Sequence, residues 1–201
     1  MSPMQIRSSQ SNDGEMVVEG YATTFNQPYT LYSWDDYEVR EEIDEHAFDE
    51  CDMTDVIMQY DHQGRVFART RNNTLELSAD GNGLKVVANL GGTELGKQLY
   101  GEIKGGYTDR MSFGFIVGLD EKTYTDAHET GKTTVLRRIK KITKLYDVSA
   151  VSVPANDQTS ISARSLHDGW IEEVKAERLR AQKRSRLALK LKMMEVDRHD
   201  H

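Results

Sequence analysis

The chain has 201 residues, 37% of them hydrophobic, and a formal net charge of −7 at pH 7. A chain of this length can bury a core without covalent staples, and its single cysteine excludes an internal disulfide framework. The acidic balance argues against nonspecific nucleic-acid binding, and no apolar run approaches the roughly 20 residues that a membrane span requires.

The chain opens with MSPMQIRSSQ, which lacks the basic and apolar regions of a secretory signal, so we expect a protein of the reducing cytoplasm. Residues 15–25 (EMVVEGYATTF) carry β-branched and aromatic residues around a glycine, which predicts a bent or bulged strand. The acidic segment 35–55 lacks the ligand spacing of a calcium loop and predicts a solvated surface, with a short helix over 44–50.

The segment 74–90 predicts a β-hairpin, because two alternating runs flank Asp80-Gly81-Asn82-Gly83, residues that tolerate the positive φ of tight turns. A helix follows within 92–106. Its apolar stripe recurs every four residues, at Leu95, Leu99 and Ile103. Thr93 is placed to cap its first turn, and two glycines stop it.

Residues 111–119 (MSFGFIVGL) and 145–155 (LYDVSAVSVPA) predict two more strands, and the stretch 137–145 before the second also alternates. Pro154 helps to end the last strand. The body is therefore expected to be rich in strands, with few helices.

From residue 166 onward the pattern becomes helical, with strong helix formers and no proline. Residues 166–201 hold nine basic and seven acidic side chains, whereas the preceding 165 residues hold 17 basic and 26 acidic ones. We predict a folded body over 1–165 and a basic amphipathic helical tail over 166–201, which docks on the body, a second copy or a partner.

Ser112 is a candidate nucleophile. It shares one strand face with Gly114 and Ile116, while Met111, Phe113, Phe115 and Val117 occupy the other. The apolar face is expected to pack on the core, and the glycine leaves space in which a peptide could approach the hydroxyl. The alternative is an ordinary polar position on a strand.

A serine nucleophile needs a histidine base, usually oriented by a third group. His62 follows an apolar run and precedes a glycine turn, a strand end of the kind where site residues collect, although a partly buried structural histidine is the alternative. His46 lies in the acidic segment. The other four histidines lie in a polar loop or in the tail: His128, His167, His199 and His201.

Asp147 is the best candidate for the third group, because a carboxylate within an apolar strand needs a partner. Pairing with Arg137 or Arg138 is the structural alternative. Asp61 is a poorer orienter of His62, because adjacent strand residues point to opposite faces. The rival nucleophiles rank below Ser112 because their strand lacks a glycine-bearing face: Ser149 and Ser152.

Cys51 lies between Glu50 and Asp52, whose charges suppress a thiolate, so it is expected to be structural. No Cys/His set has zinc spacing and no phosphate-binding glycine loop is present, so we expect chemistry without a metal or cofactor.

Several segments together resemble one family, in its order and spacing: VEGYATTFN, HAF, VIMQYDHQ, LELSADGNGLKVVANL, LYGEIKGGYTDRMSFGF and LYDVSAVSVPAN, within residues 17–163. This pattern resembles the prohead maturation proteases of tailed bacteriophages. These are serine endopeptidases related in fold to the herpesvirus assemblins. The resemblance implies an α+β fold with a mainly antiparallel β-barrel core and surrounding helices.

The resemblance assigns the serine to Ser112, the histidine to His62 and the acid to Asp147, where the family more often has glutamate. It also implies an enzyme that acts inside the immature capsid in the host cytoplasm. Such an enzyme cleaves scaffold protein or the scaffolding segment of the major capsid protein precursor, and itself. The oxyanion would be met by backbone N–H groups or an arginine, and Arg110 only shares the face of Ser112.

Two alternatives remain. One is a noncatalytic assembly factor on the same fold, which would have no reason to keep both Ser112 and His62. The other is a β-rich hydrolase or ligand-binding barrel outside virus assembly, which would leave the tail unexplained. Cleavage specificity and homodimerisation are left open.

Overall fold

The computed structural model of the chain describes residues 7–10, 16–34, 36–127 and 132–152, with scattered positions between 173 and 187. The chain divides into two units, Met1–Arg164 and Ser165–His201. All the strands and helices bounded below belong to the first unit. The predicted helical tail lies largely outside the described residues, so its structure and the boundary at 165/166 stay predictions.

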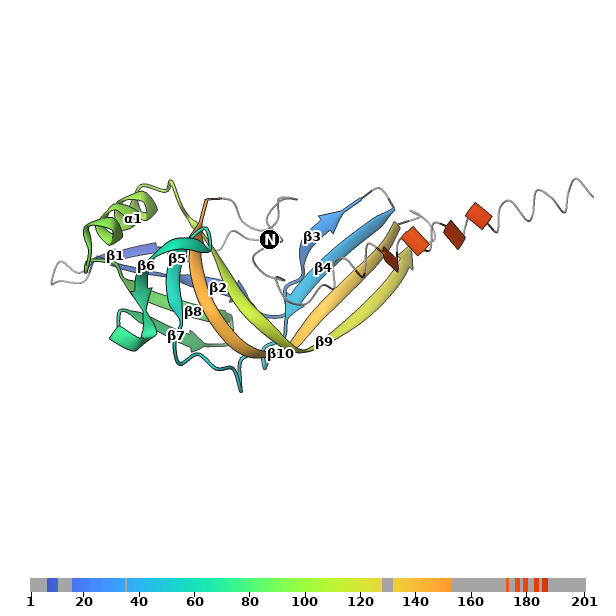
Figure 1. Cartoon of the computed structure of the whole chain (residues 1–201), viewed down its shortest axis with the longest axis horizontal. Coiled ribbons are helices and arrows are strands. Elements are labelled where there is room, and N and C mark those ends of the chain that lie inside the picture. Colours follow the sequence, from blue (N-terminus) through green and yellow to red (C-terminus); the bar gives the residue numbers. More distant parts are fainter. Residues whose placement is uncertain are drawn as a thin grey trace, which may run out of the picture. The chain divides into compact units, whose positions relative to one another are not determined.

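One sheet of the first unit has four strands in the order β1-β2-β8-β7, all antiparallel (Figure 1). Their bounds are Arg7–Gln10, Met16–Thr24, Gly83–Asn89 and Leu75–Ala79. The ladder between β2 and β8 shifts register between Tyr21 and Thr23, which confirms the bulged strand predicted at 15–25.

The second sheet has six strands and is organised around β10 (Lys132–Val151). One edge of β10 pairs along its length with antiparallel β9 (Arg110–Ala127). Its other edge pairs in parallel first with β4 (Tyr37–Ile43) and then with β5 (Ile57–Tyr60). The remaining two strands, β3 (Tyr29–Ser33) and β6 (Gln63–Arg69), lie outside β4 and β5. The predicted strand at 137–145 and the first part of the one at 145–155 thus belong to one continuous strand, while residues 153–155 with Pro154 lie outside the described residues.

The strands do not form the closed barrel expected above. Closure requires each strand to have a neighbour on both sides. Within the described part of the chain, β1 and β7 end one sheet, and β3, β6 and β9 each pair on one side only. Alternation in a sequence predicts that strands exist and which face is buried, but it does not say which strands pair. The coarser prediction, an α+β chain with a sheet-rich core, is confirmed.

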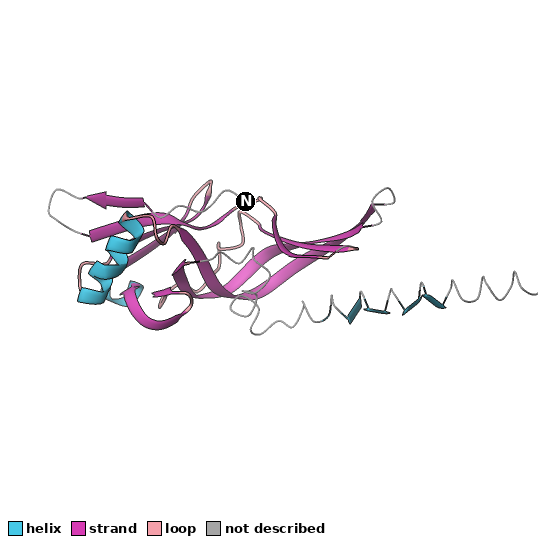
Figure 2. Cartoon of the chain, turned by 90° about the horizontal axis from the view of Figure 1, so that it is seen from above, coloured by secondary structure: helices cyan, strands magenta, loops and turns pink. Residues whose placement is uncertain are grey.

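Between residues 7 and 152, the described residues contain one α-helix, α1 (Glu94–Lys104), and one 3-10 turn, η1 (Thr70–Asn72). The scattered described positions between 173 and 187 are also helical. Figure 2 shows α1 beside the strands of the first unit. Thr93 caps α1 by accepting from the Gly96 N–H, as predicted. Leu99 and Ile103 are buried, and Gly106 adopts a φ of 75° beyond the helix end. The predicted helix at 44–50 is wrong: this segment forms turns closed by i→i+3 backbone hydrogen bonds.

The predicted hairpin at 74–90 is confirmed, since β7 and β8 pair with Ala79 opposite Leu84. Its turn works differently from the expectation, because Gly81, Asn82 and Gly83 all have negative φ. Instead, the Asp80 carboxylate accepts from the backbone N–H groups of Asn82 and Gly83, at 2.7 and 3.1 Å. This Asx turn sets the reversal of the chain.

The acidic segment 35–55 is not the solvated surface that was expected. Part of it is β4, and Glu41, Glu42 and Asp44 are buried. Five of its carboxylates pair with basic side chains of β10: Glu41–Arg137, Glu42–Arg138, Asp44–Lys140, Glu50–Lys141 and Asp52–Lys144. We call this set the β10 ion-pair ladder. Arg137 and Arg138, the two candidate partners of Asp147, thus pair with Glu41 and Glu42 instead.

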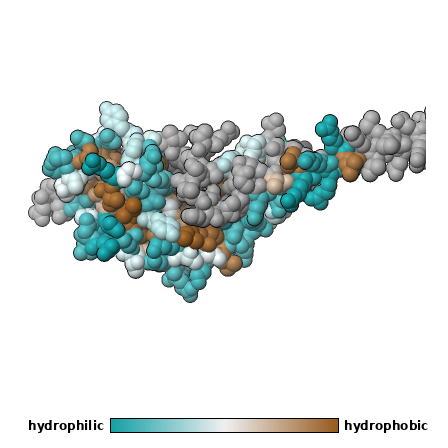
Figure 3. Space-filling model, in the orientation of Figure 1, coloured by the Kyte–Doolittle hydropathy of each residue, from teal (hydrophilic) through white to brown (hydrophobic). Residues whose placement is uncertain are grey.

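The core lies between the two sheets and α1. Phe113 and Phe115 of β9 stack with ring centroids 4.7 Å apart, and Phe48 contacts Phe113. The core-facing row of β9 therefore holds apolar side chains, as predicted. On the face drawn in Figure 3, hydrophobic side chains are also exposed among hydrophilic ones, over the end that contains α1, β6 and β7. Among the large hydrophobic side chains of β6 and α1, Val66 and Leu95 are exposed.

Candidate active site

The candidate site is built on neighbouring strands of the second sheet. Ser112 of β9 lies directly opposite Ser149 of β10, and Gly114 lies opposite Asp147. Residues paired across a ladder point to the same face, so these four form one row, on the face away from the core side chain of Phe113. The predicted division of β9 into an apolar and a serine-bearing face is thus confirmed.

His62 reaches this row from a tight turn. Asp61 and His62 connect β5 to β6, where Tyr60 pairs with Gln63, and both have positive φ, at 47° and 57°. Positive φ at both central residues is typical of the two-residue type I′ hairpin turn. The turn places His62 Nδ1 2.6 Å from Asp147 Oδ2.

The contact between His62 and Asp147 is largely sheltered from water, since the two side chains are 14% and 13% exposed. Exclusion of solvent strengthens a charge-assisted hydrogen bond. With Nδ1 bound to the carboxylate, Nε2 is the ring nitrogen left for another partner. The structure thus brings His62 and Asp147 together, although they are 85 positions apart.

The Asp147 carboxylate has a second partner. The Ser149 hydroxyl donates to Asp147 Oδ2 at 2.7 Å, so this oxygen accepts two hydrogen bonds. Gly114 makes room for the other oxygen: a Cβ at this position would lie 2.2 Å from Asp147 Oδ1. The space beside Ser112, which was expected to admit a peptide, is instead occupied at Gly114 by Asp147.

Ser112 is 3% exposed and lies diagonally across the ladder from Asp147. Diagonal neighbours in a ladder are typically about 7–8 Å apart. A side chain such as the His62 imidazole can bridge two residues at that separation. The structure therefore gathers Ser112, His62 and Asp147 on one face. Arg110, at the start of β9, has its guanidinium 3.7 Å from the Asp109 carboxylate and is partly exposed.

The other candidates have different partners. Asp61 accepts hydrogen bonds from Ser152, so it does not bind His62 through its carboxylate. His46 is exposed and its Nδ1 lies 3.1 Å from Asp49. The four remaining histidines lie outside the described residues: His128, His167, His199 and His201.

Cys51 is a poor nucleophile in this setting. Burial, and then the neighbouring Asp52 charge, raise the pKa of the Cys51 thiol to about 11. A thiol with that pKa is almost wholly protonated at neutral pH, and the thiolate is the reactive form.

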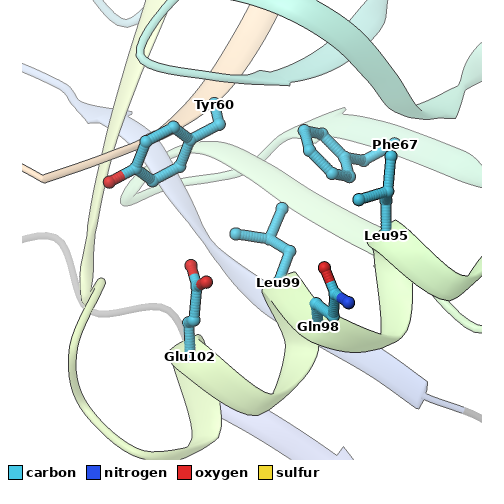
Figure 4. A pocket seen from close by; sticks show the side chains of 6 residues that line it. All are labelled: Tyr60, Phe67, Leu95, Gln98, Leu99 and Glu102. Carbon is cyan, nitrogen blue, oxygen red and sulfur yellow. The ribbon is translucent and has the colours of Figure 1, made fainter.

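A cleft of about 240 Å³ lies between α1 and the β5–β6 hairpin (Figure 4). Phe67 and Leu99 contribute to its apolar walls, and the Glu102 carboxylate adds charge. Tyr60 also lines it, and the alternation of β5 turns this side chain away from the face of Asp147 and Ser149. The cleft is therefore separate from the candidate site.

Among the described residues, no group of three His, Cys, Asp or Glu side chains is arranged to hold a metal ion. Within the same residues, no helix combines the length and the apolar character that crossing a membrane demands.

The family model described as caudovirus prohead serine protease matches residues 2–172. The chain belongs to this family. Membership of the prohead serine protease family means that the chain is a serine peptidase of the procapsid. No significant match was found among the curated proteins or the solved structures.

Two features of this prohead protease family member were not predicted from its sequence. One is the Ser149 hydroxyl on Asp147, and the other is the bond between Asp61 and Ser152. A signal for the second was present, because YDHQ between two β-rich runs fits a two-residue hairpin loop. In such a loop Asp61 does not alternate with His62 as it would in a strand.

Proposed function

We propose that the protein is a prohead maturation endopeptidase in which Ser112 is the nucleophile, His62 the general base and Asp147 the group that orients His62. The observation that carries the proposal is the 2.6 Å contact between His62 Nδ1 and Asp147 Oδ2 beside the Ser112 strand. This arrangement matches the histidine–acid half of a serine protease triad.

The proposed reaction is acyl transfer. His62 Nε2 takes the hydroxyl proton as Ser112 Oγ attacks the scissile carbonyl carbon, and the imidazolium formed is stabilised by Asp147. His62 then gives this proton to the leaving amine as the peptide C–N bond breaks. Water, deprotonated by His62, hydrolyses the acyl-enzyme and returns Ser112 to its starting form.

The substrates we propose are the scaffolding segment of the major capsid protein precursor, scaffold protein and the protease itself. Family membership supports this choice, because a prohead protease works on the proteins with which it is enclosed. We place its action inside the immature capsid in the host cytoplasm. Homodimerisation is not part of the proposal.

The test is the intact mass of wild-type, Ser112→Ala and Ser78→Ala proteins, each incubated alone and with the capsid protein precursor. Ser78 lies on β7 and is exposed, so Ser78→Ala removes a hydroxyl away from the site. We expect the wild type and Ser78→Ala to shorten the precursor or themselves, and Ser112→Ala to do neither.

Equal cleavage by wild type and Ser112→Ala would refute the nucleophile assignment. If none of the proteins cleaves, even when scaffold and capsid precursor are co-assembled, the noncatalytic assembly factor becomes the better interpretation. A fluorophosphonate, which labels activated serines, gives a second readout that does not depend on knowing the substrate.

A further inference from the structure

The turn that carries His62 has an unusual backbone. Asp61 and His62 are consecutive, neither is glycine, and both have positive φ. Hairpin turns of this type strongly favour glycine at the second central position, because L residues are strained there. Strain of this kind persists only where surrounding contacts hold the conformation.

Asp61 supplies contacts that hold the turn against the end of β10. Its N–H donates to the Ala150 carbonyl at 2.9 Å. Its carboxylate accepts from the Ser152 N–H at 3.0 Å and from the Ser152 hydroxyl at 3.0 Å. The Asp61 side chain therefore satisfies both donors of Ser152, the residue that directly follows β10.

We infer that Asp61 is a positioning residue for His62: its carboxylate clamps the β5–β6 turn to Ser152 and so holds the imidazole over Asp147. The inference rests on the proposed function of His62. Asp61 acts through the backbone of the turn, since its carboxylate is bonded to Ser152 and Asp147 occupies His62 Nδ1. Asp61 is thus not one of the residues that would contact substrate.

The strained backbone provides a sharp test. Asp61→Gly removes the clamp but relieves the strain, because glycine adopts positive φ freely. If Asp61 only shaped the turn, this change would preserve stability and reactivity together. If it positions His62, the protein stays folded while Ser112 loses its activation.

We would measure the rate of fluorophosphonate labelling and the melting temperature of full-length wild type and three variants. Asp61→Gly is expected to label about 10- to 100-fold more slowly, as a small misplacement of a catalytic group can cause, with its melting temperature retained. Asp61→Asn is expected to restore most of the rate, because its amide can accept from the Ser152 N–H, donate to the hydroxyl and tolerate positive φ.

Asn73→Gly is the matched control. Asn73 also has positive φ, at 58°, but it follows η1 and lies away from the candidate site. This variant introduces the same glycine into the same backbone region, and its labelling rate should equal that of the wild type.

The His62 ring adds a spectroscopic readout. The Nδ1–H proton, sheltered by Asp147, should give an NMR signal in wild type and Asp61→Asn that is lost by solvent exchange in Asp61→Gly, with His62→Gln assigning the signal. Wild-type labelling combined with equally fast labelling of Asp61→Gly overturns the positioning role and leaves the proposed function intact. Absence of wild-type labelling would instead overturn the proposed function.

Discussion

At the scale of single residues, the candidate site depends on a glycine, which has no side chain, at position 114. Gly114 is opposite Asp147, and the carboxylate occupies the volume that a Cβ would fill. A strand glycine normally weakens a sheet, because it has no side chain to pack. Here its small size lets an acid lie flat against the ladder and face His62.

Gly114→Ala is therefore expected to disable the site. The new Cβ would lie 2.2 Å from Asp147 Oδ1, so the carboxylate must move away from His62. We expect fluorophosphonate labelling to fall by about 100-fold. Gly101→Ala in α1 is the control, because nothing lies within 4 Å of its added Cβ. Unchanged labelling of Gly114→Ala would show that the position of Asp147 does not matter to Ser112.

Cys51 gives a prediction about pH. Because the pKa of its thiol is raised to about 11, thiolate forms only as the pH rises toward that value. Alkylation by iodoacetamide should be very slow at pH 7 and accelerate about tenfold per pH unit up to about pH 10. Protein unfolded in urea, whose thiol has an ordinary pKa, should react much faster at pH 7.

Reaction of the folded protein at the unfolded rate would contradict the raised pKa of the half-buried Cys51 thiol. Cysteine-directed reagents should also leave fluorophosphonate labelling unchanged, because Cys51 lies outside the row of Ser112.

At the scale of elements, β10 combines two tasks. Its first half pairs with β4 and carries basic members of the ion-pair ladder, and its second half pairs with β5 and carries Asp147. The most buried step of the ladder is Arg137, which is 3% exposed and binds both Glu41 and Asp120. Removing one partner from such a pair leaves an uncompensated charge in the interior.

Arg137→Met is expected to destabilise the fold by about 3–5 kcal/mol, because it removes the cation that pairs with the buried Glu41 carboxylate and with Asp120 while keeping a side chain of similar length. Lys141→Met makes the same substitution at an exposed ladder position, 44% exposed, and should change stability little. Urea denaturation measures both free energies of unfolding. Equal losses would mean that burial does not govern the strength of the ladder.

Much of the element structure could be predicted because it is local. The alternation around Phe113 predicted the core face of β9, and Thr93 predicted the start of α1. The place of Glu41 in the β10 ion-pair ladder could not be predicted, because this buried carboxylate pairs with Arg137, which lies 96 positions away in the sequence. The same limit concealed the order of the strands in the two sheets, whereas the expectation of a closed barrel came from the family resemblance.

The site shows the same division. Ser112, His62 and Asp147 were named from strand faces and from the family pattern, and the register then placed them on one face. Asp61 was set aside because a strand was assumed where the chain turns. The hairpin itself could have been predicted from YDHQ, whereas the bond from Asp61 to Ser152 joins residues 91 positions apart and needed the structure.

At the scale of the whole molecule, the first unit contains all the residues proposed for catalysis, whereas the second begins at Ser165. The basic tail predicted over 166–201 is a hypothesis about targeting: we propose that it directs the protease to scaffold or capsid protein. Helical segments of this composition often bind by laying an apolar face in a groove.

Deleting residues 166–201 should weaken binding to scaffold and capsid precursor, because the proposed contact surface is lost. It should leave fluorophosphonate labelling unchanged, since the candidate site lies in the first unit. A pull-down with both partners measures the first effect. Unchanged binding would refute the targeting role of the tail.

The order of strands along the chain also has a consequence for synthesis. The strand that holds Ser112 and the strand that leads to His62 both hydrogen-bond to β10, the last strand among the residues that the structure describes. A ribosome adds about 5–20 residues per second. The nascent chain therefore contains Ser112 and His62 for seconds before β10, with which both of their strands pair, has been synthesised. The candidate site can therefore assemble only after β10 has been synthesised, so the nascent chain cannot cleave proteins before then.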